Sequence, residues 1–136
     1  METERRTLFR HGSLFLLLAT MFGLILAAAP HPSKWLAAHL TALLTGILLI
    51  ALGGLWSELR LAAATRRRAM MLILTGSWVG TVTNVYSAIV NLPGPASDPG
   101  RAPDAMWQAY VLFALLAVIV PATIGGFFLV WRGLRG

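Results

Sequence analysis

The chain has 136 residues, of which 57% are hydrophobic and only 12% are charged. A single soluble core of this length cannot enclose so many apolar side chains, so the composition indicates a membrane protein. The net charge of +6 does not indicate nucleic acid as a partner, because the basic residues stand in short blocks beside the apolar segments.

Four apolar segments are long enough to cross the roughly 30 Å hydrocarbon layer at about 1.5 Å per helical residue. They lie at about residues 8–29, 35–56, 69–91 and 106–131. Continuous apolar runs of this length lack the alternation of barrel strands, and almost nothing remains for a soluble domain. We therefore predict an all-α fold in which residues 1–136 form one domain of four transmembrane helices.

The first segment resembles a secretory signal peptide, because Arg5 and Arg6 precede its apolar run and three alanines end it. We expect a membrane helix instead, since the run is at the long limit for a signal core and another span follows almost at once. His11 and His31 lie near the ends of this segment, and both are expected to be solvated.

The second segment contains His39 within an otherwise apolar stretch. A titratable side chain is costly in lipid, so His39 is a candidate metal or haem ligand, proton carrier or interhelical hydrogen-bonding partner. Ala42 and Gly46 follow at i+3 and i+7 and form a small-residue face. The spacing alone favours helix packing there, and the alternative is a flat macrocycle, with Ala42 and Gly46 binding the cofactor beside His39.

The third segment carries a polar stripe formed by Ser77, Thr81, Asn84, Ser87 and Asn91. His39 and Asn84 both belong to the outer half of the bilayer in the predicted topology, so a shared pocket is geometrically possible. An interhelical hydrogen bond of the Asn84 amide is the equal alternative. Trp78, in the same segment, is expected to pack between helices, and the alternative is that it lines a pocket for an aromatic substrate.

The fourth segment contains Pro121, which should bend the helix near mid-span. The Pro- and Gly-rich residues before the fourth segment cannot continue a helix, and Asp104 is expected to cap the helix that follows them. Tryptophans at segment ends are predicted to anchor the helices at the membrane interface: Trp35, Trp56, Trp107 and Trp131.

Basic residues are distributed unequally between the two sides of the predicted bundle. One side has Arg5, Arg6, Arg10, Arg60, Arg66, Arg67, Arg68, Arg132 and Arg135, whereas the other has only Lys34 and Arg101. Because basic residues are retained in the cytoplasm, both termini should be cytoplasmic. The run from Arg66 to Arg68 is interpreted as such a retention signal, or as a contact with anionic lipid.

Missing residue types also limit the chemistry. No span contains aspartate, glutamate or two histidines, which disfavours proton-coupled transport and a bis-histidine electron-transfer haem. The absence of cysteine excludes disulfides, thiolate catalysis, iron–sulfur clusters and covalent c-type haem, but it leaves non-covalent haem b possible. Hydrolytic triads and multi-carboxylate metal sites lack their parts.

The stretch from Trp35 to Gly46, with a glycine seven residues after His39, resembles the family of styrene oxide isomerase and (hydroxyamino)benzene mutase, small membrane isomerases of bacteria. Further similar motifs are Arg10-His11-Gly12, Phe22-Gly23, the Leu-Gly and Trp ending of the second segment, and Thr75-Gly76-Ser77-Trp78. The resemblance covers nearly the whole chain, and the short loops look more like those of the mutase. It implies a multi-pass protein of the bacterial inner membrane.

The resemblance also implies a homotrimer with ferric, non-covalent haem b at the subunit interfaces and His39 as the axial iron ligand. Thr45 and Asn84 then stand where the epoxide isomerases have an asparagine and a tyrosine that hold the substrate. A haem with one protein ligand leaves a coordination position open to a substrate heteroatom and acts as a Lewis acid.

The hypothesis that follows is a haem-b isomerase of a small aromatic hydroxylamine, of the type hydroxylaminobenzene to 2-aminophenol. Isomerisation of styrene oxide to phenylacetaldehyde ranks second, because the tyrosine that holds the substrate in the epoxide isomerases is replaced here by Asn84. A non-enzymatic membrane subunit, in which His39 and Asn84 only hydrogen-bond between helices, is a different class, and a one-haem electron carrier is a third.

Overall fold

A computed structural model of the chain describes residues 2–29, 32–90 and 106–135. These residues form four long helices, namely α1 (Glu2–Leu26), α2 (Pro32–Leu55), α3 (Ala63–Ile89) and α4 (Met106–Arg135). A short 3-10 helix, η1 (Trp56–Glu58), follows α2, and the described residues contain no strand. The prediction of an all-α fold with four helices is confirmed.

The helices are longer than the apolar segments that predicted them. α1 begins before residue 8, α3 begins before residue 69, and α4 continues to Arg135. The added turns are rich in arginine and glutamate, which are good helix formers and so continue a helix beyond its apolar part. Hydropathy therefore locates the middle of each helix but not its ends.

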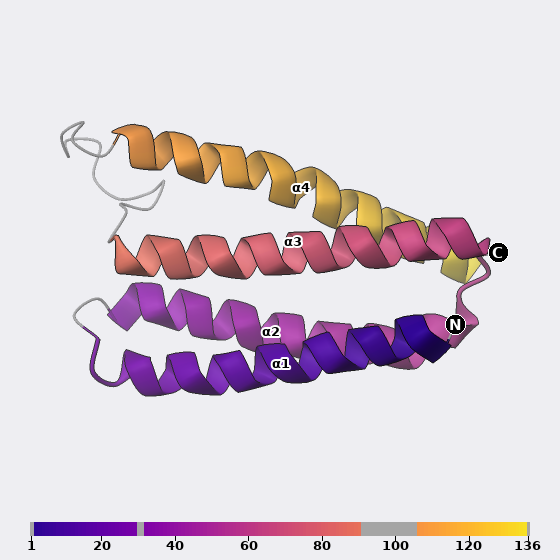
Figure 1. The fold of residues 1–136 in the computed structure, drawn as a ribbon, viewed down its shortest axis with the longest axis horizontal. Helices are drawn as coiled ribbons and strands as arrows, with labels where there is room; N and C mark the ends of the chain where they lie inside the picture. The colour runs from indigo at the N-terminus through magenta and orange to yellow at the C-terminus, as the bar shows by residue number, and fades with distance from the viewer. Residues whose placement is uncertain (1, 30–31, 91–105, 136) are drawn as a thin grey trace.

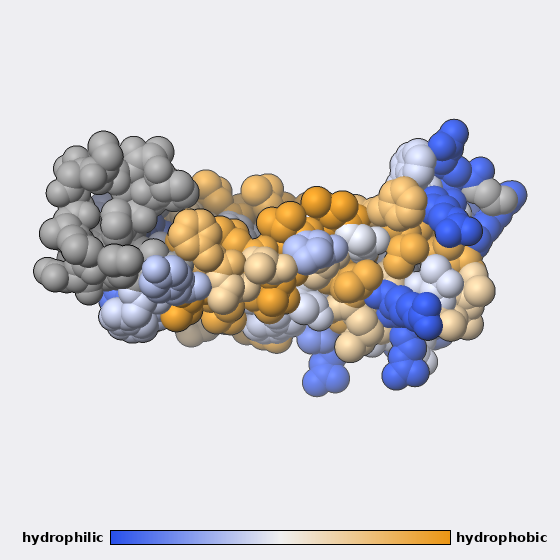
Figure 2. Space-filling model, turned by 90° about the horizontal axis from the view of Figure 1, so that it is seen from above, coloured by the Kyte–Doolittle hydropathy of each residue, from blue (hydrophilic) through white to orange (hydrophobic). Residues whose placement is uncertain are grey.

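The four helices lie roughly antiparallel, and the two termini are at the same end of the molecule (Figure 1). α1 packs along α2, α3 packs along α4, and contacts between α2 and α3 join the two pairs. The end that holds both termini is also the one toward which strongly hydrophilic side chains gather in Figure 2. This geometry agrees with termini on one side of a membrane, and their cytoplasmic location stays a prediction.

Three of the described helices are long and apolar enough to cross a membrane, namely α1, α2 together with η1, and α4. They present large exposed apolar side chains, among them Leu24 and Phe113, which are 74% and 67% exposed. Such side chains suit contact with lipid. α3 falls short of this hydropathy, because serine, threonine and asparagine interrupt its apolar residues. The four-span topology therefore stays a prediction.

Two glycines bring α1 and α2 into close contact. A Cβ atom at Gly46 would lie 2.8 Å from Cδ2 of Leu16 and 2.9 Å from the backbone oxygen of Gly12. A Cβ atom at Gly12 would lie 2.9 Å from the backbone oxygen of Gly46. Only glycine allows this approach. Gly46 and the fully buried Ala42, one turn earlier, therefore belong to the packed interior.

A buried ion pair links three elements at the end that holds the termini. Nε of Arg66 donates a hydrogen bond to Oε2 of Glu4 at 2.7 Å, and Nε1 of Trp56 donates to the same oxygen at 3.3 Å. Trp56 is 1% exposed, so its prediction as an interface anchor is wrong. Arg66 is buried, unlike Arg67 and Arg68, so its interpretation as a lipid contact is also wrong. Both side chains are buried because the carboxylate of Glu4, which is distant in sequence, accepts their hydrogen bonds.

His11 is half-buried, which contradicts the expectation that it is solvated. Its Nδ1 accepts a hydrogen bond from Nε1 of Trp78 at 3.2 Å. Because α1 begins at Glu2, His11 lies more than two turns inside the helix and faces α3. Trp78 also packs on Phe15, with ring centroids 4.6 Å apart, so its expected packing role is confirmed. The predictions for His31 and Asp104 fall outside the described residues.

Candidate functional site

The imidazole of His39 points from α2 toward α1. Its Nδ1 lies 2.8 Å from the backbone oxygen of Ala19. A carbonyl oxygen can only accept, so Nδ1 carries the proton, and in the neutral ring Nε2 keeps its lone pair. Nε2 forms no hydrogen bond with the described residues. Histidines that bind metals have this arrangement, in which the second ring nitrogen donates to a carbonyl or carboxylate.

Gly23 provides the space in which this ring lies. It follows Ala19 by four residues on α1, and a Cβ atom there would be 3.3 Å from Nδ1 and 3.4 Å from Cε1 of His39. Such contacts are tight enough to displace the ring. α1 thus contributes both the hydrogen-bond acceptor and the room for the imidazole, and two small residues, Ala19 and Gly23, position it.

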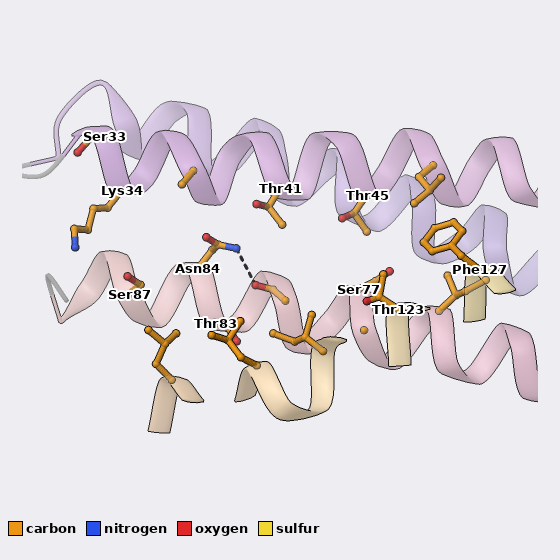
Figure 3. Close-up of a pocket in the computed structure, with 18 residues that line it drawn as sticks. Ser33, Lys34, Thr41, Thr45, Ser77, Thr83, Asn84, Ser87, Thr123 and Phe127 are labelled. Atoms are coloured by element: carbon orange, nitrogen blue, oxygen red, sulfur yellow. Dashed lines mark hydrogen bonds between the residues drawn. The ribbon is translucent and has the colours of Figure 1, made fainter. Parts of the chain in front are cut away.

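A cavity of about 610 Å³ lies between α2, α3 and α4 (Figure 3). Its polar wall consists of hydroxyl and amide groups from the three helices, together with one ammonium group: Ser33, Lys34, Thr41, Thr45, Ser77, Thr83, Asn84, Ser87 and Thr123. Its apolar wall includes Leu48, Ile73, Leu112, Leu116, Ile119 and Phe127. The cavity therefore suits a small, mostly apolar ligand with one or two hydrogen-bonding groups.

Thr45 and Asn84 face this cavity from opposite sides. Figure 3 shows Thr41 and Thr45 pointing from α2 toward the polar side chains of α3. Nδ2 of Asn84 donates to the backbone oxygen of Gly80, in its own helix, at 3.0 Å. Its Oδ1 forms no hydrogen bond with the described residues and is left to accept one from a ligand. Among the described residues of one chain, Asn84 therefore does not form the interhelical hydrogen bond considered for it.

The structure brings Thr45 and Asn84 together and separates both from His39. His39 does not line the cavity, because six residues along a helix turn the side chain by about 120° from that of Thr45. The pocket considered for His39 and Asn84 is therefore not formed within one chain. Ala42 and Gly46 lie in the packed interior on the α1 side, and this packing does not support their assignment to a cofactor.

Several residues of the cavity were not predicted from the sequence: Thr41, Thr83, Thr123 and Phe127. Thr41 had a signal, since it precedes Thr45 by one helical turn on the same face. Thr123 and Phe127 had none, because they reach the cavity only through the packing of α4 on α3. A Cβ atom at Gly76 would lie 2.6 Å from Oγ1 of Thr123, which shows how close that packing is.

A metal held by His39 would need further ligands from a cofactor or another chain. Within residues 2–29, 32–90 and 106–135, no group of three histidine, cysteine, aspartate or glutamate side chains could hold a metal ion.

The match to one protein family extends over all four helices. The family model described as styrene oxide isomerase matches residues 4–135. Hydroxylaminobenzene mutase HabB of Ectopseudomonas oleovorans is 26% identical over 133 residues, which cover 96% of this chain and 80% of the relative. Hydroxylaminobenzene mutase HabA of the same organism is 28% identical over 123 residues, or 86% of this chain and 91% of the relative. No solved structure shows a significant match.

Proposed function

The chain belongs to the styrene oxide isomerase family and is an isomerase, and on this basis we propose that it rearranges a small aromatic hydroxylamine, as in hydroxylaminobenzene to 2-aminophenol. Two relatives named as mutases of hydroxylaminobenzene support this substrate class. The family description favours a second candidate, the isomerisation of styrene oxide to phenylacetaldehyde.

The observation that carries the proposal is the hydrogen bond from Nδ1 of His39 to Ala19, because it leaves Nε2 as a lone-pair donor in an apolar protein. His39 would hold a ferric, non-covalent haem b through Nε2. When bound, this haem supplies a Lewis-acidic iron with a position open to the heteroatom of the substrate.

We further propose a homotrimer in which the haem lies between subunits. The separation of His39 from the polar cavity within one chain supports this arrangement, since a neighbouring copy can bring its own His39 toward the cavity of the first. The site is then completed by association, as is common where symmetric oligomers share a ligand between copies.

The cavity residues bind and orient the substrate. Thr45 and Asn84 would hydrogen-bond the hydroxyl group, while the aliphatic and aromatic wall packs on the ring. The rearrangement breaks the nitrogen–oxygen bond and forms a bond from oxygen to a ring carbon. The proton lost from that carbon is balanced by one gained at nitrogen. No oxidant or reductant is consumed, and the apolar wall limits capture of a cationic intermediate by water.

The proposed location is the bacterial inner membrane, with four spans and cytoplasmic termini. α3 is less apolar than the other three helices because of its serine, threonine and asparagine side chains. Several of these point into the cavity and not toward lipid, which supports α3 as the remaining span.

The test is a visible spectrum of the protein expressed with ample haem and purified in detergent. We expect a Soret band, its loss or severe weakening in His39→Ala, and its retention in His11→Ala, which removes a histidine bound to Trp78. Absence of the band in the unmodified protein would refute haem dependence. Product analysis with hydroxylaminobenzene and styrene oxide side by side then decides between the two substrate classes.

A further inference from the structure

A second cavity, of about 640 Å³, lies between the start of α3 and the last turns of α4. It is lined by Arg60, Leu61, Ala62, Thr65, Trp131, Arg132 and Arg135. It shares no residue with the cavity of Thr45 and Asn84. We call it the arginine cavity.

The walls of the arginine cavity are fixed by contacts between the segment before α3 and the end of α4. The backbone N–H of Arg60 donates to the backbone oxygen of Gly133 at 3.0 Å. Leu61 packs so closely on Gly133 that a Cβ atom there would lie 2.8 Å from Cγ of the leucine. These contacts hold Arg60 beside Arg132 and Arg135, although about seventy residues of sequence separate them.

Three arginines line this cavity, and none of them forms an ion pair with an acidic side chain that the structure describes. The ion pairs among the described residues involve Arg5, Arg6 and Arg66, and none involves an arginine of the cavity. The guanidinium of Arg135 lies over the ring of Trp131, 4.7 Å from its centroid. Neighbouring like charges repel, so an anion between them would be stabilised.

The donors of the arginine cavity suit a phosphate group. Guanidinium groups offer paired N–H donors that match phosphate oxygens. The hydroxyl of Thr65 adds a further donor. α3 begins at Ala63 after Ala62, which makes no side-chain cap, so the first amides of the helix have no side-chain acceptor. Among the described residues, no carboxylate side chain lines the cavity to oppose an anion.

We propose that the arginine cavity binds a phosphate group and that an anionic phospholipid of the adjoining membrane surface supplies it. Trp131 and Leu134, at the end of α4, are 52% and 51% exposed and offer apolar contact to a lipid beside the charged cavity. Basic cavities between membrane helices bind anionic head groups on the cytoplasmic side, where this end is predicted to lie. A free phosphate ion shares the same chemistry, and the experiment separates the two.

The experiment compares two double variants of the full chain that remove the same charge from the same end of the molecule. Arg132→Gln/Arg135→Gln removes two arginines of the cavity, whereas Arg67→Gln/Arg68→Gln removes two exposed arginines outside it. Each protein is delipidated in detergent, shown to keep its helical circular dichroism, and titrated with phosphatidylglycerol or phosphatidylcholine. Bound lipid is counted by native mass spectrometry.

We expect the unmodified protein to retain phosphatidylglycerol in preference to phosphatidylcholine. The Arg67→Gln/Arg68→Gln variant, which changes exposed arginines outside the cavity, should keep most of this preference. The cavity variant should bind phosphatidylglycerol roughly thirtyfold more weakly, since each basic residue near anionic lipid contributes about 1 kcal/mol. Equal losses in the two variants, or equal binding of the two lipids, would overturn the proposal. Inorganic phosphate is added in a parallel titration, and complete displacement of the lipid by millimolar phosphate would contradict the lipid as the source.

Discussion

The imidazole of His39 on α2 donates its Nδ1 proton to the backbone oxygen of Ala19 on α1, over 2.8 Å. This bond places a proton on Nδ1, so that in the neutral ring Nε2 carries the lone pair. The position of the ring also explains why the Phe22-Gly23 motif has a glycine, because Gly23 leaves the space that the ring occupies. The packing of α1 on α2 therefore orients Nε2, the ring nitrogen that is proposed to bind the haem.

Gly23→Ala should disturb His39 without removing it. The added methyl group would lie 3.3 Å from Nδ1, so the ring must shift by a few tenths of an ångström, and we expect its hydrogen bond to Ala19 to weaken. In protein prepared without haem, ¹⁵N spectra of labelled histidine should show loss of the Nδ1-protonated form of His39, assigned by comparison with His39→Ala. Haem affinity should fall by about 10- to 100-fold, as for other groups that orient a metal ligand.

The matched control for this variant is Gly54→Ala, where nothing lies within 4 Å of the new atom. Its histidine spectrum and haem affinity should equal those of the unmodified protein. An unchanged His39 tautomer in Gly23→Ala would show that Gly23 does not position the ring.

Gly46→Ala should destabilise the α1–α2 pair. The new atom would lie 2.8 Å from a carbon of Leu16 and 2.9 Å from the backbone oxygen of Gly12, so the helices must separate. Overpacking of this kind costs about 1–3 kcal/mol. Thermal unfolding in detergent should therefore occur at a lower temperature than in the unmodified protein, whereas Gly54→Ala, on the same helix, should show no such loss. Equal midpoints for the two variants would contradict this account of the packing.

Thr45→Val and Asn84→Leu should each weaken substrate handling while the fold and haem spectrum persist. Each replacement keeps the approximate size of the side chain and removes its hydrogen-bonding groups from the cavity. Loss of one such bond should lower kcat/KM for hydroxylaminobenzene by about tenfold. Thr20→Val is the control, because the Thr20 hydroxyl is exposed and bonds to Leu16 of its own helix. Unchanged kcat/KM in both cavity variants would place substrate binding elsewhere.

The Glu4–Arg66 pair should make stability depend on acidity. Burial raises the pKa of Glu4, but hydrogen bonds from Arg66 and Trp56 outweigh it and hold the pKa below the ordinary value of 4.5. The folded state therefore favours the carboxylate. The resulting stabilisation is complete above the ordinary pKa and disappears as the pH falls through the lowered pKa of the folded protein.

Thermal unfolding of the unmodified protein and Glu4→Gln, measured in detergent from about pH 7 to about pH 3, checks this dependence. We expect the unmodified protein to be more stable at neutral pH and the difference to shrink in acid. Glu58→Gln, which changes an exposed glutamate of η1, should show no comparable difference at neutral pH. A difference between the unmodified protein and Glu4→Gln that does not vary with pH would exclude the ionised carboxylate as its source.

The candidate site could be predicted only in part from the chain. His39 was evident because an imidazole in an apolar run is costly, and Asn84 was evident for the same reason. The separation of His39 from Asn84 was not evident, since it depends on which helix packs on each face of α2. Thr123 gave no signal, because a threonine in an apolar helix can return its hydroxyl to its own backbone and needs no partner.

The sequence by itself determined the helical fold and the family, because apolar runs of this length and a histidine followed by small residues are local features. Only the tertiary structure decided that Ala19 and Gly23 hold His39, that Thr45 and Asn84 share a cavity without it, and that Arg66 is buried beside Glu4. The physical reason is that helical periodicity sets the angle between side chains on one helix. Packing between helices decides what each of those side chains meets.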